Sequence, residues 1–176
     1  MRRKILRKLL RHQAPVGGEL IDRAASAMLK ARPARPDDLA ALLALYRVSE
    51  VSAAADPLER AERIWLDMLA REGVTVFVAE AEARIVATCM LITAPNLLRA
   101  GRQHGFLENV VTHPQYRGRG FGRAVVGAAL AAAWASNCHH VMLQSGRADP
   151  RVHRFYEGCG FEPGFRTAYV AKRPKD

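Results

Sequence analysis

The chain has 176 residues, of which 49% are hydrophobic and 25% charged, as in a single soluble domain large enough to bury a core. No apolar run approaches the roughly 20 residues that a membrane-spanning helix needs. Its three cysteines are widely spaced and form no CxxC pair, which argues against a disulfide framework or a zinc ribbon. We therefore expect free thiols and a reducing compartment, the cytoplasm.

The net charge of +10 is concentrated at the N-terminus. Residues 1–30 carry eight Lys or Arg against Glu19 and Asp22, giving +6, and residues 31–176 carry nineteen against fifteen, giving +4. The larger part is therefore only mildly basic, and we predict no specific nucleic-acid partner for it. We divide the chain into a basic N-terminal extension (residues 1–29), which is dispensable or contacts a membrane surface or RNA, and one domain (residues 30–176).

From residue 30 the pattern predicts alternating strands and helices. The predicted strands are residues 28–34, 75–80, 83–93, 104–112, 139–145 and 165–172. The predicted helices are residues 36–50, 56–73, 120–136 and 150–158. The order β-α-α-β-β-β-α-β-α-β predicts an α/β fold in which helices cover a mixed sheet.

The stretch VVTHPQYRGRGFGRAVVGAAL, residues 110–130, places a strand, a tight turn and a helix in succession. Its glycines leave amide groups uncovered at the head of the helix, where the helix dipole favours an anion such as phosphate. Arg117, Arg119 and Arg123 add fixed cations to this cradle. The spacing excludes both GxxxxGK[ST] and GxGxxG, because no Lys-Ser/Thr follows and the third glycine is one residue short.

Arg117-x-x-Gly120-x-Gly122 resembles the acyl-CoA signature of the GNAT superfamily of N-acetyltransferases, and RFYEGCGF at residues 154–161 resembles a second motif of that family. The resemblance covers residues 30–172. It implies a single GNAT-like domain with a central, mostly antiparallel sheet, a parallel splayed pair of strands and flanking helices. It also implies acetyl-CoA as cosubstrate and no metal.

The resemblance assigns the cosubstrate to the cradle and to the strand before it. Backbone amides of the cradle would hold the pyrophosphate, and residues 110–112 would pair with the pantetheine arm. Asp149 stands where many members have an asparagine that contacts this arm. The residues implied are Val110, Val111, Thr112, Arg117, Gly118, Arg119, Gly120, Phe121, Gly122, Arg123 and Asp149.

Two side chains are the candidates for catalysis. Tyr156 matches the family's general acid, which protonates the departing thiolate; the alternative is an aromatic core pair with Phe155. Glu108 interrupts a nearly apolar strand, where a carboxylate is costly unless it is paired or functional. We expect a base or amine ligand at Glu108, with an ion pair to Arg102 as the alternative. In an unbulged strand, one face carries Phe106, Glu108, Val110 and Thr112.

The predicted reaction is direct transfer of an acetyl group from acetyl-CoA to a primary amine of a small molecule or amino acid. Arg99 and Arg102 favour a carboxylate-bearing amine. The alternatives are acetylation of a protein N-terminus or lysine, and a non-catalytic acyl-CoA-binding module. The resemblance also allows a homodimer. No metal site is predicted, because the spacing of the pair His139-His140 makes no ligand set with His104, His113 or His153.

Overall fold

The computed structural model describes residues 29–49, 52–164 and 166–174. The proposed N-terminal extension lies outside these residues, apart from Leu29. Nowhere in the part described is a helix long and apolar enough to cross a membrane.

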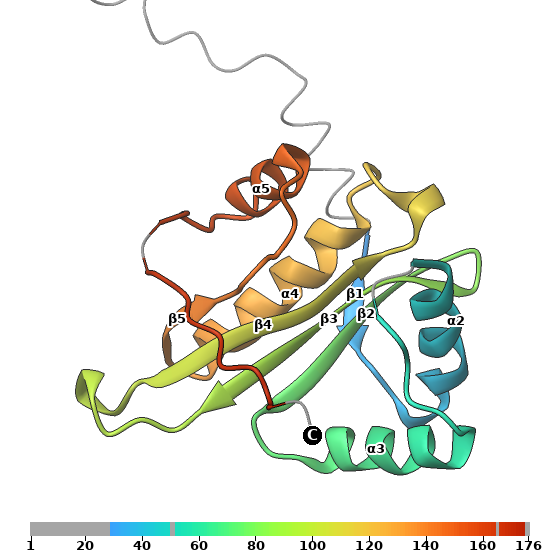
Figure 1. Ribbon diagram of the computed structural model, residues 1–176, viewed down its shortest axis with the longest axis horizontal. Coiled ribbons are helices and arrows are strands. Elements are labelled where there is room, and N and C mark those ends of the chain that lie inside the picture. The colour runs from blue at the N-terminus through green and yellow to red at the C-terminus, as the bar shows by residue number, and fades with distance from the viewer. Residues whose placement is uncertain (1–28, 50–51, 165, 175–176) are drawn as a thin grey trace, which may run out of the picture.

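A five-stranded sheet with strand order β1-β2-β3-β4-β5 forms the centre of the molecule (Figure 1). The pairs β1–β2, β2–β3 and β3–β4 are antiparallel, and the pair β4–β5 is parallel. The strands are β1 (Ala31–Pro33), β2 (Val74–Ala81), β3 (Arg84–Ala94), β4 (Gln103–Thr112) and β5 (Cys138–Met142). The helices are α2 (Leu39–Ser49), α3 (Leu58–Ala70), α4 (Phe121–Ala135) and α5 (Pro150–Glu157). The predicted mixed α/β fold with a parallel pair is confirmed.

Each face of the sheet carries its own core. Helix α4 packs on one face over a cluster that includes Cys89, Leu107 and Val125, and α5 and the segment after it add to this layer. Helices α2 and α3 pack on the other face over a cluster that includes Trp65 and Val111. The predicted helices therefore cover both sides of the sheet, as α/β layers require.

The β2–β3 hairpin closes with the two residues Glu82 and Ala83, both of which have positive φ, 51° and 57°. A two-residue loop in which both residues have positive φ forms a tight hairpin turn, and the twist of this turn matches that of the paired strands. The predicted final strand is wrong: residues 166–172 are irregular. Tyr169 and Val170 in this segment are 89% and 73% exposed, so no buried face selects a strand conformation there.

A carboxylate fastens the first strand to the head of α2. Asp38 is only 8% exposed and accepts hydrogen bonds from Nη1 and Nη2 of Arg32, at 2.7 and 2.9 Å. It also accepts one from the backbone N–H of Arg35, at 2.7 Å. The guanidinium of Arg32 is the main cause of the lowered pKa of Asp38.

Strand β4 contains a bulge. Thr88 and Met90, two positions apart on β3, face Val111 and Glu108, which are three positions apart on β4. The extra residue is accompanied by a left-handed backbone at Asn109, with φ 51°. A bulge of this kind turns the side chains that follow it to the opposite face.

The bulge divides the residues of β4 between the two cores. Leu107 packs in the core under α4, whereas Val111, four positions later, packs in the core under α2 and α3. Val110 instead packs against the α4 side. Side chains before and after the bulge therefore do not alternate in one series. The condition of an unbulged strand is not met, and Phe106, Glu108, Val110 and Thr112 therefore do not share one face.

Candidate functional site

The glycine-arginine stretch connects β4 to α4 and leaves backbone amides uncovered. Gly118 and Gly120 have φ of 73° and 90°, a backbone that other residues adopt at a cost. The first helical hydrogen bond of α4 runs from Ala124 N–H to Gly120 O at 2.9 Å. The N–H groups of the first helical residues, Phe121 to Arg123, therefore have no acceptor within the helix. Such a helix start is a binding site for an anion.

Gly122 allows the head of α4 to lie directly against its neighbours. A Cβ atom at this position would stand 2.9 Å from Oγ1 of Thr112 and 3.3 Å from Cζ of Phe155. The end of β4, the start of α4 and the middle of α5 therefore meet at this glycine. Only a residue without a side chain permits that approach.

The cradle's arginines are held by different contacts. Arg117 donates from Nε to the carbonyl oxygen of Thr112 at 3.3 Å. The guanidinium of Arg119 lies 5.2 Å from the ring centroid of Tyr116, in cation–π geometry. Arg123 reaches α5, because a Cβ on Gly158 would stand 3.1 Å from its Nη2. Three positive charges therefore belong to the segment that contains the helix start.

The two parallel strands separate toward the cradle. The pairing of β5 with β4 joins Gln103–Phe106 to the region Cys138–Met142 and stops there. From Leu107 to Thr112, β4 is paired on its β3 side alone within the part of the chain described. An extended ligand can therefore hydrogen-bond to this free edge, as an added strand does.

Tyr156 lies half-buried on α5, among aromatic rings and near the proposed base. Its ring centroid is 5.1 Å from that of Phe155 and 6.1 Å from that of Phe161. Burial is the main cause of the raised pKa of Tyr156, and the nearby thiols and the carboxylate of Glu108 add to it. The phenol therefore remains protonated at neutral pH, as a proton donor must.

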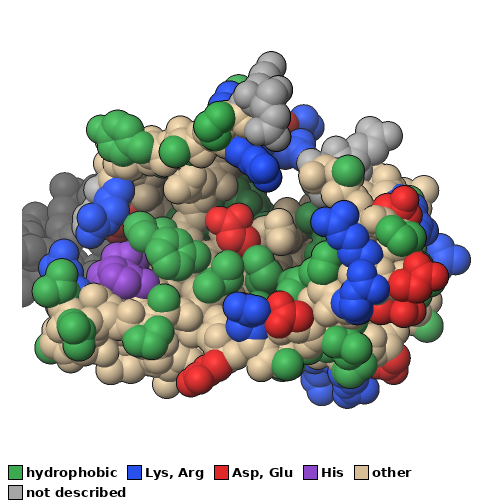
Figure 2. All heavy atoms as spheres, turned by 60° about the horizontal axis from the view of Figure 1, so that its bottom comes forward, with side chains coloured by type: hydrophobic (Ala, Val, Ile, Leu, Met, Phe, Trp, Pro, Cys, Tyr) green, Lys and Arg blue, Asp and Glu red, His purple; other side chains and the backbone are tan. Residues whose placement is uncertain are grey.

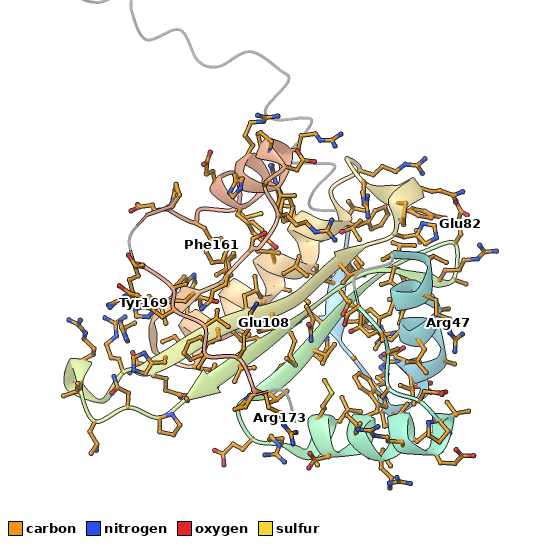
Figure 3. The ribbon with its side chains drawn as sticks, viewed as in Figure 1. Arg47, Glu82, Glu108, Phe161, Tyr169 and Arg173 are labelled. Carbon is orange, nitrogen blue, oxygen red and sulfur yellow. The ribbon has the colours of Figure 1, made fainter. Side chains whose placement is uncertain are left out.

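Glu108 occupies the middle of β4 and is exposed (Figure 3). Its surroundings differ from the apolar ones that its place in the sequence indicates, because the separation of β5 from β4 opens this part of the strand to solvent. Arg102, its alternative ion-pair partner, donates instead from Nη2 to the carbonyl oxygen of Cys138 at 3.3 Å. Among the residues described, no Glu108–Arg102 ion pair is formed.

Asp149 caps the start of α5. Its Oδ1 accepts a hydrogen bond from the N–H of Arg151 at 2.9 Å, and its Oδ2 lies 2.8 Å from Nη2 of the same arginine. The hydrogen bonds from Arg151 lower the pKa of Asp149 to about 2. This carboxylate therefore has a local structural role, and its contact with a cosubstrate stays a prediction.

A pocket of about 230 Å³ lies on the α2–α3 side of β4. Tyr46 and Trp65 line it from the helices, residues 52–55 from the connection between them, and Asn109 and Val111 from the bulge of β4. Sequence reasoning missed Tyr46 and Asn109; Asn109 enters the lining at the bulge of β4, which depends on the pairing with β3. The pocket thus borders the strand that carries Glu108.

The structure brings His104, His139 and His140 together, which their spacing in the sequence did not predict. One ring nitrogen from each lies within 4.8 Å of the others. Figure 2 shows histidine side chains at the surface beside basic and apolar ones. Burial is the main cause of the lowered pKa values of His139 and His140; Arg99 and Arg166 are further causes for both, and Arg102 for His139. Arg99 and Arg102 thus lie near these rings.

Comparison with known proteins identifies the class of protein that this fold and cradle define. The sequence model of the acetyltransferase (GNAT) family matches residues 39–161. The chain therefore belongs to this family, as the two motifs predicted.

Among curated proteins, the chain is 35% identical over 97 residues to glucosamine 6-phosphate N-acetyltransferase from Trypanosoma brucei brucei, a match covering 54% of this chain and 64% of that protein. It is 29% identical over 140 residues to aminoglycoside N(6')-acetyltransferase type 1 from Stenotrophomonas maltophilia, covering 78% and 89%. The chain thus spans somewhat less than two thirds of the trypanosome protein. It spans 53% of the protein named probable glucosamine 6-phosphate N-acetyltransferase 2 from Oryza sativa.

Solved structures agree with this assignment. A proposed acetyltransferase from Agrobacterium tumefaciens superimposes with a TM-score of 0.76 at 44% identity, covering 82% of this chain and 99% of that one. Glucosamine-6-phosphate N-acetyltransferase from Arabidopsis thaliana superimposes with a TM-score of 0.70 at 20% identity, covering 83% and 98%, which shows the shared fold.

Proposed function

We propose that the protein transfers an acetyl group directly from acetyl-CoA to the primary amine of a small molecule. The observation that carries the proposal is the junction of β4 and α4, where an uncovered helix start and three arginines adjoin a free strand edge. Acetyl-CoA combines a pyrophosphate with an extended, amide-bearing arm, and these two parts match the two features. The cosubstrate residues are those that the family resemblance assigns.

The cradle would bind the pyrophosphate through the amides of Arg119, Gly120, Gly122 and Arg123. The edge of β4 at residues 110–112 would hydrogen-bond to the pantetheine amides. This places the thioester beside the middle of β4, where the strands separate. Glu108 and Tyr156 are then the candidate groups for proton transfer.

The transfer needs an uncharged amine, and it releases a thiolate. Glu108 accepts the amine's proton, directly or through water, and the amine nitrogen forms a bond to the acetyl carbon. As the carbon–sulfur bond breaks, the phenol of Tyr156 donates its proton to the sulfur of coenzyme A. The phenolate then takes up the proton that the nitrogen loses as it becomes an amide, and Glu108 returns its proton to solvent. A thiol has a pKa of about 8.5 and a phenol of about 10, so the free-energy cost of proton transfer from the phenol to the sulfur is small.

The acceptor would enter from the α2–α3 side, through the pocket lined by Tyr46, Trp65 and Asn109. Two curated relatives are named for amino-sugar acceptors, which favours a small molecule over a protein. The positions of Arg99 and Arg102, beside the histidines, give no support to recognition of a carboxylate by these two residues. Amines to compare are glucosamine 6-phosphate, an aminoglycoside, amino acids and a peptide with a free N-terminus.

Calorimetric titration of acetyl-CoA tests the cradle. Gly118→Glu places a carboxylate among the amides, at a position where a Cβ meets no atom within 4 Å. We expect binding to weaken at least tenfold. Gly101→Glu is the matched control, because Gly101 has a similar φ of 76° and equally open surroundings but lies far along the chain, before β4. Equal binding by both variants, or no binding by the unmodified protein, contradicts the proposal.

Release of coenzyme A with each amine then tests catalysis. Binding without release for any amine in the set would favour the alternative of an acyl-CoA-binding module. Release with the peptide alone would favour a protein acetyltransferase.

A further inference from the structure

The three histidines come together through a second irregularity in the sheet, at the closed end of the parallel pair. Gln103 of β4 pairs with Cys138, and the next residue, His104, pairs with His140. His139 is therefore an extra residue on β5, a bulge. Bulges redirect side chains, and this one brings the rings of His139 and His140 to a centroid separation of 3.8 Å.

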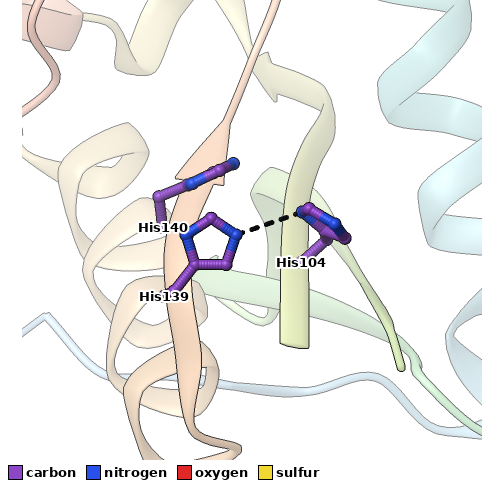
Figure 4. Close-up of side chains that lie close together, drawn as sticks. All are labelled: His104, His139 and His140. Atoms are coloured by element: carbon purple, nitrogen blue, oxygen red, sulfur yellow. Dashed lines mark hydrogen bonds between the residues drawn. The ribbon is translucent and has the colours of Figure 1, made fainter. Parts of the chain in front are cut away.

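His104 completes the cluster from the neighbouring strand (Figure 4). Its Nδ1 lies 3.3 Å from Nε2 of His139, and its ring centroid lies 5.7 Å from that of His140. All three side chains are half-buried. Nε2 of His140 is buried and has no hydrogen-bond partner, which leaves a ring nitrogen unsatisfied in the cluster.

We propose that His104, His139 and His140 bind a divalent transition metal ion of the zinc type, separate from the acetyl-transfer site. Imidazole nitrogen is a preferred ligand of such ions. Two nitrogens bound at about 2.0–2.1 Å in tetrahedral geometry lie roughly 3.3 Å apart. The separation of 3.3 Å between His104 and His139 matches this value, and the three ligand atoms all lie within 4.8 Å of one another, so binding of an ion requires a ring to turn toward the other two.

The surroundings define the rest of the coordination. Three imidazoles leave the fourth position of a tetrahedral ion for water or an anion. Arg99, Arg102 and Arg166 act electrostatically on His139, and their positive charges oppose a bound cation, so an anionic fourth ligand such as hydroxide or chloride would be favoured over a neutral one. Arg102 is held in place by its hydrogen bond to the carbonyl oxygen of Cys138.

A bound ion would join β5 to β4. The pairing of these strands covers only Gln103–Phe106 on the β4 side, so few backbone hydrogen bonds fix β5 to the sheet. A ligand that binds the folded state and not the unfolded one stabilises the fold by mass action. Metal binding therefore has a readout in thermal unfolding that does not depend on acetyl transfer.

The test uses the full chain without a histidine tag, freed of metal by a chelator and titrated with Zn²⁺ by calorimetry. We expect one ion per chain and a raised unfolding temperature. His104→Gln and His139→Gln should each weaken the affinity at least tenfold and abolish the temperature increase. His153→Gln, on the exposed side of α5, is the matched control and should bind like the unmodified protein.

Substitution with Co²⁺ identifies the ligands independently of how well the variants fold. A spectrum of nitrogen-ligated Co²⁺ without a thiolate charge-transfer band supports three imidazoles. A thiolate band that disappears in Cys138→Ser would assign the metal to that neighbouring thiol and overturn the proposal. Absence of stoichiometric Zn²⁺ binding would also overturn it, leaving a hydrogen-bonded pair of His104 and His139.

Discussion

At the scale of single side chains, the proposed acetyl transfer assigns two proton movements to Tyr156 and Glu108. Tyr156 and Glu108 come from α5 and β4, and the carboxylate is close enough to contribute to the raised pKa of the phenol. The phenol is half-buried and the carboxylate exposed. Burial is the main cause of the raised pKa of Tyr156, which suits the phenol to hold its proton until the thiolate departs.

Replacing Tyr156 by Phe should lower kcat about 10- to 100-fold, because the variant cannot protonate the departing thiolate. Its Kd for acetyl-CoA should remain within about twofold, since the cradle is untouched. Since the pKa of Tyr156 is raised above 10.0, the unmodified enzyme should lose no activity through phenol ionisation below about pH 10. Steady-state kinetics and calorimetry check both points. Tyr169→Phe, at an 89% exposed residue, is the control, and an unchanged kcat for Tyr156→Phe would refute its role.

Glu108→Gln should lower kcat/KM about 100-fold near pH 7, because the amine then loses its proton without help. The loss should shrink as the pH rises toward the pKa of the amine, where the uncharged form becomes abundant. Glu62→Gln, on the exposed side of α3, is the matched control. A pH-independent loss would instead assign Glu108 to amine binding.

At the scale of elements, the candidate cradle and the histidine cluster lie where regular structure is interrupted. The bulge in β4 sends residues before and after it to opposite cores, and the bulge in β5 gathers the histidines. The head of α4 approaches β4 because Gly122 has no side chain. Interruptions of this kind are common beside binding sites, since they redirect side chains and uncover backbone groups.

The connection between β1 and α2 depends on Asp38. Asp38→Asn should lower the free energy of unfolding at pH 7 by about 2 kcal/mol, because it weakens charge-assisted hydrogen bonds in a nearly buried site. The pKa of Asp38 is lowered in the folded state, so its contribution is present above about pH 4 and falls as the pH drops through the folded pKa.

Urea unfolding at pH 7 and pH 3 measures this difference, which should be smaller at pH 3. Asp67→Asn is the control, because its ion pair with Arg71 is exposed and such pairs contribute about 0.5 kcal/mol or less. If both variants lose the same free energy of unfolding at pH 7, the buried network of Asp38 stabilises the fold no more than an exposed ion pair does.

At the scale of the whole molecule, most of the net charge and the candidate site belong to different parts of the chain. More than half of the net charge of +10 belongs to residues 1–30, whereas the cradle, the pocket and the candidate catalytic groups belong to residues 39–161. Leu29 packs against the core under α4, so the domain's packing includes the chain from that residue onward.

Removal of residues 1–27 should leave the Kd for acetyl-CoA within about twofold of the full chain, because every proposed ligand of the cosubstrate lies in the domain. Calorimetry under identical salt conditions checks this expectation, since ionic strength alters the affinity for a polyanion. Sedimentation of both proteins with anionic vesicles provides the companion measurement. Association that survives the truncation would exclude a tethering role of the basic residues.

The family and the mixed sheet were predicted correctly from the sequence, because each depends on local features, and the anion cradle at the start of α4 stays a prediction. The run from Arg117 to Gly122 sets backbone geometry over a few residues, and periodicity marks most helices and strands. The roles of Tyr156 and Glu108 remain predictions, since they depend on a bound acetyl-CoA.

Tertiary structure alone decided which distant residues meet. The face to which each side chain of β4 points depends on a bulge, and the position of the bulge follows from pairing with β3. Glu108 and Val110 therefore do not share the face expected in an unbulged strand. The last predicted strand had a suitable pattern, but its side chains are exposed. His104 joins His139 and His140 because two strands pair in parallel across more than thirty intervening residues. Packing and register are collective properties of the folded chain, and no local stretch encodes them.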